Sequence, residues 1–221
     1  MIGIISALSS ELSSFLNVLE NKVEKNIMGY TFYEGLINNK EVVLTKAGIG
    51  KMNATASTIL LIEHYDVQLV INSGIAGGYE KSLKTLDTVL GTQVACYDID
   101  MTLDGNPYGC IEKNQRLLTS KIQNLPNAIS GLIMTADYFA YDREKLEKIF
   151  NKYYSDVMPI AVDMESYAIA LVCEKYHKDW VVLRTISDLV GEDKQIQMYY
   201  NFPELASQKS FSIIMSNFFN K

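Results

Sequence analysis

The sequence lacks the features that define several large classes of protein. None of its apolar runs approaches the roughly 18 residues that a membrane-spanning helix needs, so we expect no membrane protein. The opening MIGIISALSSEL is apolar for only about eight residues and has no basic segment before it, which predicts a buried strand rather than a signal peptide. We therefore expect a soluble protein that stays in the cytoplasm.

Cysteine and histidine are both scarce. The three cysteines, Cys96, Cys110 and Cys173, form no CxxC pair, which argues against a disulfide framework or a zinc site. Only His64 and His177 are present, near the ends of predicted helices, so a serine–histidine or cysteine–histidine mechanism has little material. We expect no metal, no cofactor and a reducing compartment.

Positive charge is also limited. Asp and Glu number 26 against 20 Lys and Arg, for a formal net charge of −6. An acidic surface repels phosphate backbones, so nucleic acid is not expected as a partner. The 221 residues are 48% hydrophobic and contain neither a proline-rich linker nor a repeat. This length and composition predict one domain over residues 1–221.

Short runs rich in Val and Ile alternate with stretches of helical periodicity. The runs predict buried strands at Ile2–Ala7, Glu41–Thr45, Gln68–Asn72, Thr88–Val94, Leu132–Thr135, Ile160–Asp163 and Trp180–Ile186. Apolar residues three and four apart predict helices at Ser10–Val18, Lys51–His64, Arg143–Tyr153, Glu165–Tyr176 and Pro203–Phe219. This alternation predicts a three-layer α/β/α domain with a twisted, mostly parallel sheet. In Tyr30–Thr45, the pair Asn38-Asn39 between two alternating runs predicts an antiparallel hairpin, so the sheet should be mixed.

Glycine and carboxylate residues follow several of the predicted strands. The glycine segments 46–51 and 72–78 fit tight turns or a close approach of backbone to a ligand, and neither completes a phosphate-binding fingerprint. Glu11, Asp163, Glu165 and Asp188 would lie at the rim of the sheet, where partial burial raises a carboxyl pKa. Each could also be a helix cap or a first-turn acid. Together they would suit acid–base hydrolysis.

Six segments, in this order, resemble the nucleoside phosphorylase/hydrolase superfamily, and within it most closely the methylthioadenosine/S-adenosylhomocysteine nucleosidases. They are IGIISALSSEL, KAGIGKMNA, INSGIAGG, GLIMTADYF, AVDMESYAIALVC and VVLRTISD, at 2–12, 46–54, 71–78, 131–139, 161–173 and 181–188. The resemblance implies a nucleoside phosphorylase-like fold and a homodimer. It also implies hydrolysis of 5′-methylthioadenosine and S-adenosylhomocysteine, with 5′-deoxyadenosine as a further candidate, in methionine salvage and S-adenosylmethionine recycling.

The resemblance also implies roles for individual residues. Asp188 would protonate adenine N7, and Glu11, helped by Arg184, would orient and deprotonate the attacking water. Glu165 would bind a ribose hydroxyl. Phe139, which on local grounds could equally be packing, would stack on adenine. The remaining residues expected to bind substrate are Met164 beside the sugar, Ala140 through its backbone, Ser187, Gly77 and Ile49.

Two departures from the family pattern concern the substrate. Ile75 stands where a serine is common and cannot contribute a hydroxyl to the water network. The segment 97–109 is one residue shorter than usual, with Asp104 and Asn106 where aromatics are expected. Residues near Met101–Tyr108 are those that would reach the 5′ pocket of a neighbouring subunit. A more polar pocket there would favour a polar 5′ group.

Three other readings stay open on the sequence. A nucleoside phosphorylase usually clamps phosphate with arginines, but only Arg116, Arg143 and Arg184 are present, and none precedes the segment Ser73–Gly78. A catalytically silent nucleoside-binding module would not need a proton donor such as Asp188. A generic dinucleotide-binding domain lacks its glycine fingerprint. Hydrolysis is favoured.

Overall fold

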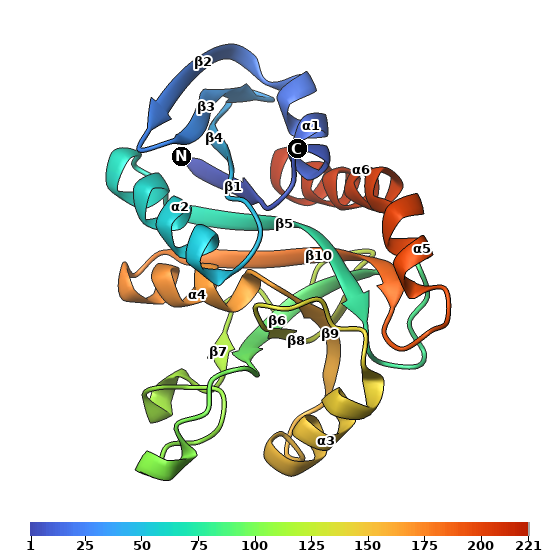
Figure 1. Cartoon of the computed structure of the whole chain (residues 1–221). Coiled ribbons are helices and arrows are strands. Elements are labelled where there is room, and N and C mark those ends of the chain that lie inside the picture. Colours follow the sequence, from blue (N-terminus) through green and yellow to red (C-terminus); the bar gives the residue numbers. More distant parts are fainter. Residues whose placement is uncertain (221) are drawn as a thin grey trace.

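The computed structural model describes residues 1–220, and within them a ten-stranded sheet with helices packed on both faces (Figure 1). The strands are β1 Ile2–Ser6, β2 Glu20–Ile27, β3 Tyr30–Ile37, β4 Lys40–Lys46, β5 Leu69–Gly78, β6 Thr88–Cys96, β7 Leu118–Thr119, β8 Ile129–Thr135, β9 Pro159–Asp163 and β10 Asp179–Leu189. The helices are α1 Ser9–Val18, α2 Lys51–His64, α3 Arg143–Tyr153, α4 Ser166–Lys175, α5 Gln195–Asn201 and α6 Pro203–Ile214, the last followed by a π-helical turn Met215–Phe219.

The sheet is mixed, as predicted, because two groups of parallel strands meet in opposite directions. One group runs β4–β1–β5–β10 and the other β6–β8–β9. The groups join antiparallel at β10–β6 and β5–β9, so that β10, β6, β8, β9 and β5 close into a ring of pairings. Antiparallel pairings to β2, β3 and β7 complete the sheet. Parallel and antiparallel pairings are equal in number, five of each, and the two longest registers, β5–β10 and β6–β8, are parallel.

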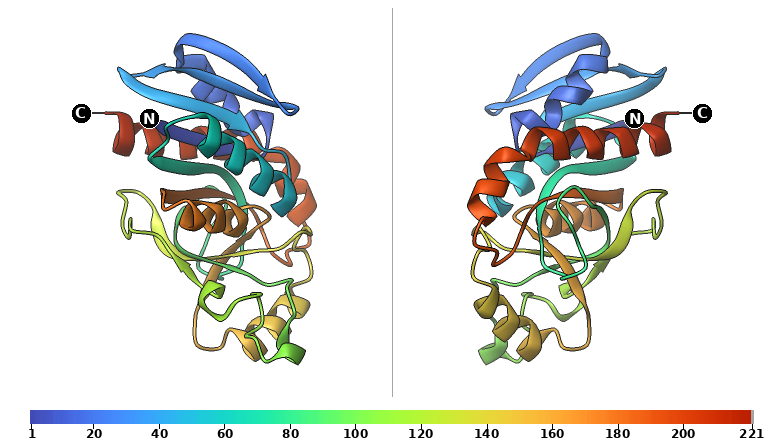
Figure 2. Two further views of the ribbon diagram at one scale, coloured as in Figure 1. Left: turned by 90° about the vertical axis from the view of Figure 1, so that its left-hand side faces the viewer. Right: turned by 90° about the vertical axis from the view of Figure 1, so that its right-hand side faces the viewer.

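Alternation along the inner strands accounts for the layers. Ile4 of β1 packs with Leu12 and Phe15 of α1, whereas its neighbour Ile5 packs in the cluster that holds Leu61 of α2. Successive strand residues point to opposite faces, so two apolar neighbours require a helix layer on each face. Helices α1 and α6 contact one another on one face, and α2 and α4 on the other. The hairpin of β2–β4 and helix α3 lie at opposite ends of the molecule (Figure 2).

The predicted hairpin is confirmed with its turn. β3 and β4 pair antiparallel up to Ile37 and Lys40, which leaves Asn38 and Asn39 as the two-residue loop. Their φ angles of 47° and 62° are the positive values that a type I′ turn requires and that Asn tolerates. The seven predicted strands and five predicted helices are likewise present, with ends shifted by a few residues.

Other boundaries differ from the prediction for physical reasons. β5 continues through Ser73–Gly78, expected as a loop, because these glycines sit in extended backbone between β10 and β9. β10 likewise continues to Leu189, with a register shift between Ile186 and Asp188. The exposed edge strand β2 and the short helix α5 were not predicted. β2 buries no residue, and α5 has only seven residues, of which only Gln195 is buried, so neither shows an apolar periodicity.

No helix within residues 1–220 combines the length and apolar character needed to cross a membrane. All ten strands join one sheet, so the topology marks no boundary between domains. The single domain over residues 1–221 stays a prediction.

Candidate active site

A pocket opens at the carboxyl ends of β1, β5, β9 and β10. In sheets with parallel strands, ligands bind at this edge, where loops and helix starts converge. Nine of the ten sequence-predicted site residues line it: Glu11, Ile49, Gly77, Phe139, Ala140, Met164, Glu165, Ser187 and Asp188. The tenth, Arg184, lies behind the wall with no exposed surface. The structure therefore brings all ten together.

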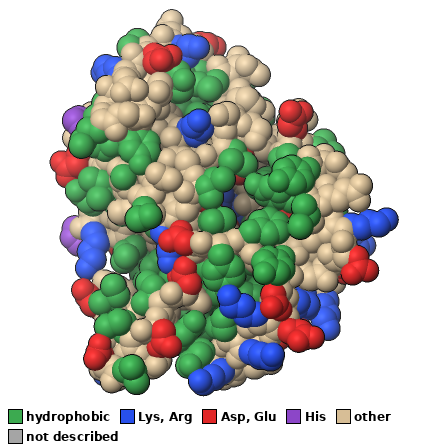
Figure 3. Space-filling view, viewed as in Figure 1, with side chains coloured by type: hydrophobic (Ala, Val, Ile, Leu, Met, Phe, Trp, Pro, Cys, Tyr) green, Lys and Arg blue, Asp and Glu red, His purple; other side chains and the backbone are tan. Residues whose placement is uncertain are grey.

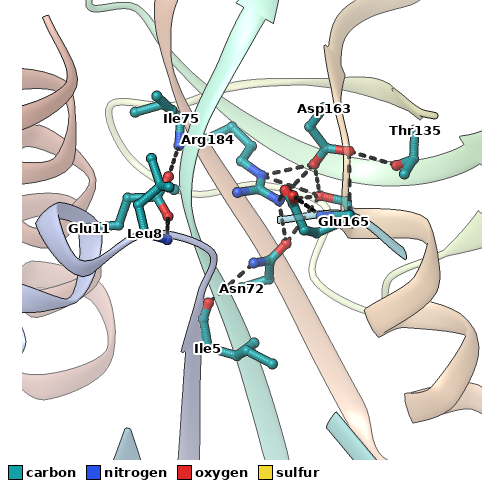
Figure 4. A network of polar contacts seen from close by, with 12 residues as sticks. Ile5, Leu8, Glu11, Asn72, Ile75, Thr135, Asp163, Glu165 and Arg184 are labelled. Atoms are coloured by element: carbon teal, nitrogen blue, oxygen red, sulfur yellow. Dashed lines mark hydrogen bonds and ion pairs between the residues drawn. The ribbon is translucent and has the colours of Figure 1, made fainter. Parts of the chain in front are cut away.

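Arg184 is the centre of a buried polar network (Figure 4). Its Nε and Nη2 lie 2.9 and 2.8 Å from Asp163 Oδ2, and Nη2 also donates to Asn72 Oδ1 at 2.8 Å and Glu165 Oε2 at 3.3 Å. Thr135 donates to the other oxygen of Asp163 at 2.6 Å. Burial alone would lower the Arg184 pKa, but the surrounding carboxylates raise it, so the guanidinium stays charged.

One guanidinium nitrogen of Arg184 takes no part in this network. Nη1 is buried and has no hydrogen-bond partner within residues 1–220. A Cβ on Gly74 would lie 2.2 Å from this nitrogen and 2.6 Å from Glu11 Oε1. Glycine is therefore required at position 74, and the donor and the acceptor approach the same point from two sides.

Glu11 is held by backbone donors. It lies in the first turn of α1, 2% exposed, and accepts N–H bonds from Leu8 at 2.8 Å and Ile75 at 2.9 Å. Burial raises the Glu11 pKa, while Arg184 and these N–H groups oppose the rise. Glu11 is thus both an acidic residue in the first turn of a helix and a residue that lines the pocket. Ile75 contributes its backbone N–H here, where the sequence departure concerned only its side chain.

Glu165 joins the glycine turn to the network. Gly50, with φ of +91°, donates its N–H to Glu165 Oε1 at 2.9 Å. A side chain at that φ would be strained, which explains the glycine. Burial raises the pKa of Glu165 to about 7, with Arg184 lowering it and Asp163 raising it further.

Asp188 has a different environment. It lies inside β10, just past the register shift, and is 2% exposed. Ser187 Oγ lies 2.6 Å from Oδ1, Gln195 Nε2 lies 2.8 Å from Oδ2, and no Lys, Arg or His of residues 1–220 forms an ion pair with it. Burial raises the pKa of Asp188, and these two neutral hydrogen bonds oppose the rise.

Two aromatic rings form one wall. Phe139 packs edge-on against Tyr199 of α5 with centroids 5.2 Å apart, and both line the pocket. Tyr199 and Gln195 were not predicted, because a short helix after a polar loop has no local pattern that ties it to the sheet. Asn72 and Asp163 were also not predicted as partners of Arg184. Each is the last residue of a predicted strand, and that position was the only available signal.

A second polar cluster lies beside the pocket. Asp98 accepts from the ammonium of Lys51, from Cys96 Sγ at 2.9 Å and from the N–H of Asp137 at 2.7 Å. Asp137 in turn accepts the N–H of Lys51 at 2.7 Å. The cluster ties the start of α2, next to Gly50, to the loop that carries Phe139.

The remaining arginines lie elsewhere. Arg116 pairs with Asp156 at 2.6 Å and Arg143 with Glu147 at 3.0 Å, and neither lines the pocket. Over residues 1–220, no group of three His, Cys, Asp or Glu side chains is arranged to hold a metal ion.

Comparison with known proteins gives consistent results. The model of the phosphorylase superfamily matches residues 1–218. A 5′-methylthioadenosine/S-adenosylhomocysteine nucleosidase of Exiguobacterium is 37% identical, over 97% of this chain and 96% of the relative. The Streptococcus pneumoniae nucleosidase, solved with the transition-state inhibitor MT-ImmA, superposes with a TM-score of 0.88 at 29% identity, over 97% of this chain and 96% of that one. A futalosine hydrolase of Helicobacter pylori superposes with a TM-score of 0.89 at 28% identity, over 97% of this chain and 95% of that one.

Proposed function

This chain belongs to the phosphorylase superfamily and, within it, to the family of 5′-methylthioadenosine/S-adenosylhomocysteine nucleosidases, and on that premise we propose that it hydrolyses the N-glycosidic bond of these two nucleosides to release adenine. The observation that carries the proposal is one pocket with carboxyl groups in two environments. Glu11 and Glu165 lie beside a buried arginine, whereas Asp188 has only neutral partners.

The neutral end suits the departing base. Negative charge develops on adenine as the bond breaks, and protonation at N7 removes it. Burial without a cation raises the Asp188 pKa, which favours the protonated form that an acid needs. Phe139 and Tyr199 would supply an apolar wall for the planar ring, and the backbone of Ala140, which also lines the pocket, would read its edge. Ser187 acts here through Asp188.

The charged end suits the sugar and the water. Arg184 Nη1 is a donor without a protein partner and Glu11 Oε1 is an acceptor, and both face the backbone of Gly74. A water held between them would be oriented by the guanidinium and would lose its proton to Glu11. Glu165 would accept from a ribose hydroxyl, beside Met164. Gly77 and Ile49 complete this part of the wall.

Charge balance supports the same mechanism. Three carboxyl groups, Glu11, Asp163 and Glu165, surround the guanidinium of Arg184. The excess of acidic groups favours a ribosyl ring that becomes positive in the transition state. It disfavours phosphate as the nucleophile, because a phosphate dianion would approach carboxylates rather than free arginines. We therefore propose hydrolysis over phosphorolysis, and turnover over silent binding.

Assembly, pathway and location are part of the proposal. Exposed apolar side chains occur near the pocket, at Ile49, Met52 and Tyr141, and Leu103 in the expected contact segment Met101–Tyr108 is fully exposed. On the face shown in Figure 3, apolar side chains gather beside a hollow. Such a patch suits a second copy of the chain, so we propose a homodimer that completes the 5′ pocket. We also propose a cytoplasmic enzyme of methionine salvage and S-adenosylmethionine recycling.

The test is adenine release from a panel of nucleosides, with and without phosphate. The panel is 5′-methylthioadenosine, S-adenosylhomocysteine, 5′-deoxyadenosine, adenosine and aminofutalosine. We expect adenine together with a free reducing sugar, at a rate that does not depend on phosphate. Ribose 1-phosphate formed only with phosphate would instead identify a phosphorylase, and tight adenine binding with no release would identify a binding module.

A further inference from the structure

We infer that Gln195 is a positioning residue that holds the carboxyl group of Asp188 and determines which of its two oxygens carries the catalytic proton. The inference rests on the proposed function, because it assigns a task to the proton donor of that reaction. It concerns a residue of α5 that lies seven positions after Asp188 in the sequence.

The orientation of the Gln195 amide follows from two backbone groups. Its Oε1 accepts the N–H of Gly191 at 2.9 Å, and its Nε2 donates to the carbonyl oxygen of Ala140 at 2.8 Å. A backbone N–H can only donate and a carbonyl oxygen can only accept, so a flipped amide would face like groups on both sides. The second N–H of Nε2 is therefore the group that meets Asp188 Oδ2 at 2.8 Å.

This contact separates the two oxygens of Asp188. Oδ2 receives the amide N–H and acts as an acceptor, which disfavours a proton on the same atom. Oδ1 lies 2.6 Å from the hydroxyl of Ser187, which can either donate or accept. The proton of the neutral acid is therefore placed on Oδ1.

The same amide connects Asp188 to the rest of the base wall. Gln195 is 4% exposed, and its side-chain amide makes three hydrogen bonds, to Gly191, Ala140 and Asp188. It begins α5, the helix that brings Tyr199 against Phe139. One side chain thus holds the proton donor, the carbonyl of Ala140 and the helix that covers the base in a single arrangement.

Burial raises the pKa of Asp188, and the hydrogen bonds from Ser187 and Gln195 oppose the rise. Other ionisable groups also line the pocket. They are Tyr138, Tyr199 of α5, Glu11 of α1, and Asp163 and Glu165 at the end of β9, and none is a cation. Arg184, on the same strand, is engaged by Asp163 and Glu165. A hydrogen bond to the ionised form lowers a carboxyl pKa, so removal of the Gln195 donor should raise it.

The experiment compares Gln195→Leu with Gln197→Leu, a glutamine exposed on the same helix. We expect kcat for adenine release to fall about 10- to 100-fold in Gln195→Leu, with a much smaller change in KM. The alkaline limb of the kcat/KM profile should move to higher pH, since that limb reports ionisation of the acid. Gln197→Leu should match the wild type in both. Gln195→Met, with similar volume and no donor, repeats the test if the leucine variant does not fold.

Two results would overturn the inference. An unchanged pH profile in both Gln195 variants, with lower activity, would mean that the residue only supports the fold. Tighter adenine binding with unchanged or higher kcat would mean that the amide competes with the base. Neither result would affect the proposed function, which fails separately if the wild-type protein releases no adenine.

Discussion

The two ends of the pocket handle buried carboxyl groups in opposite ways. At the sugar end, Asp163 and Glu165 share the Arg184 guanidinium at 2.8 and 3.3 Å. At the base end, Asp188 has only the hydroxyl of Ser187 and the amide of Gln195, at 2.6 and 2.8 Å. Burial raises the pKa at both ends, but only the sugar end has a cation that opposes it.

The difference explains how one residue type can serve two tasks. A cation opposes the rise in pKa that burial causes and so favours a charged acceptor, whereas a buried carboxyl group without a cation lacks that opposition. The separation of the two environments, rather than the presence of several carboxylates, is what suits the pocket to breaking a bond between a cationic sugar and an anionic base. Each prediction below alters one end and leaves the other in place.

The largest effect should come from Asp188→Asn. The amide keeps the shape of the side chain but cannot deliver a proton, and general acid assistance is typically worth about 100- to 10,000-fold. We expect turnover to fall into that range or below detection, with circular dichroism and melting temperature unchanged. Adenine release near the wild-type rate would refute the assignment of the acid.

Arg184→Met should be the most damaging change for stability. It leaves Asp163, whose side chain is 1% exposed, without its partner, and removing one member of a buried ion pair costs about 3–5 kcal/mol. Urea unfolding would measure this loss, and activity should fall as well. Lys121→Met, whose side chain is 81% exposed and which loses only the surface pair with Asp179, serves as the control. Equal losses in the two variants would contradict the contrast between buried and exposed pairs.

The pH dependence of stability should reveal Glu165. Its pKa is about 7 in the folded protein against an ordinary 4.5, so the folded state binds more protons between these values. Its contribution to the unfolding free energy is full below pH 4.5 and is lost as the pH rises through 7. We expect this decline to be smaller in Glu165→Gln, measured by melts from pH 5 to 8. In the control Glu144→Gln, at an exposed position on α3, the decline should persist.

Ser187→Ala should have a smaller effect on activity at the base end than Asp188→Asn. The change removes the hydroxyl 2.6 Å from Asp188 Oδ1 but leaves the Gln195 contact. A single hydrogen bond is worth about 1 kcal/mol, so kcat/KM should fall about fivefold. A loss as large as that of Asp188→Asn would mean that Ser187 itself transfers the proton.

Ile75→Ser should have the smallest effect. It introduces the hydroxyl that is common in the family, while the Ile75 N–H to Glu11 at 2.9 Å belongs to the backbone and is kept. We expect kcat to change by less than about threefold, equivalent to roughly 0.6 kcal/mol. A rise of tenfold or more would show that the water at the sugar end depends on a side-chain hydroxyl.

Much of the fold could be predicted because it depends on local patterns. Asn38-Asn39 between alternating runs predicted the hairpin, and the Val- and Ile-rich runs predicted the inner strands. The edge strand β2 could not be predicted, because it buries no residue and so has no apolar alternation. The reversal of direction between β10 and β6 depends on contacts between distant segments.

The sequence alone determined which chemical groups are present and which strand ends they follow, since strand position and residue type are local properties. Only the tertiary structure decided what those groups can do. Glu165 and Asp188 follow the same kind of sequence pattern, yet one lies 3.3 Å from Arg184 and the other contacts Gln195. A carboxyl pKa depends on burial and on neighbours brought in from remote segments, and these exist only once the chain has folded.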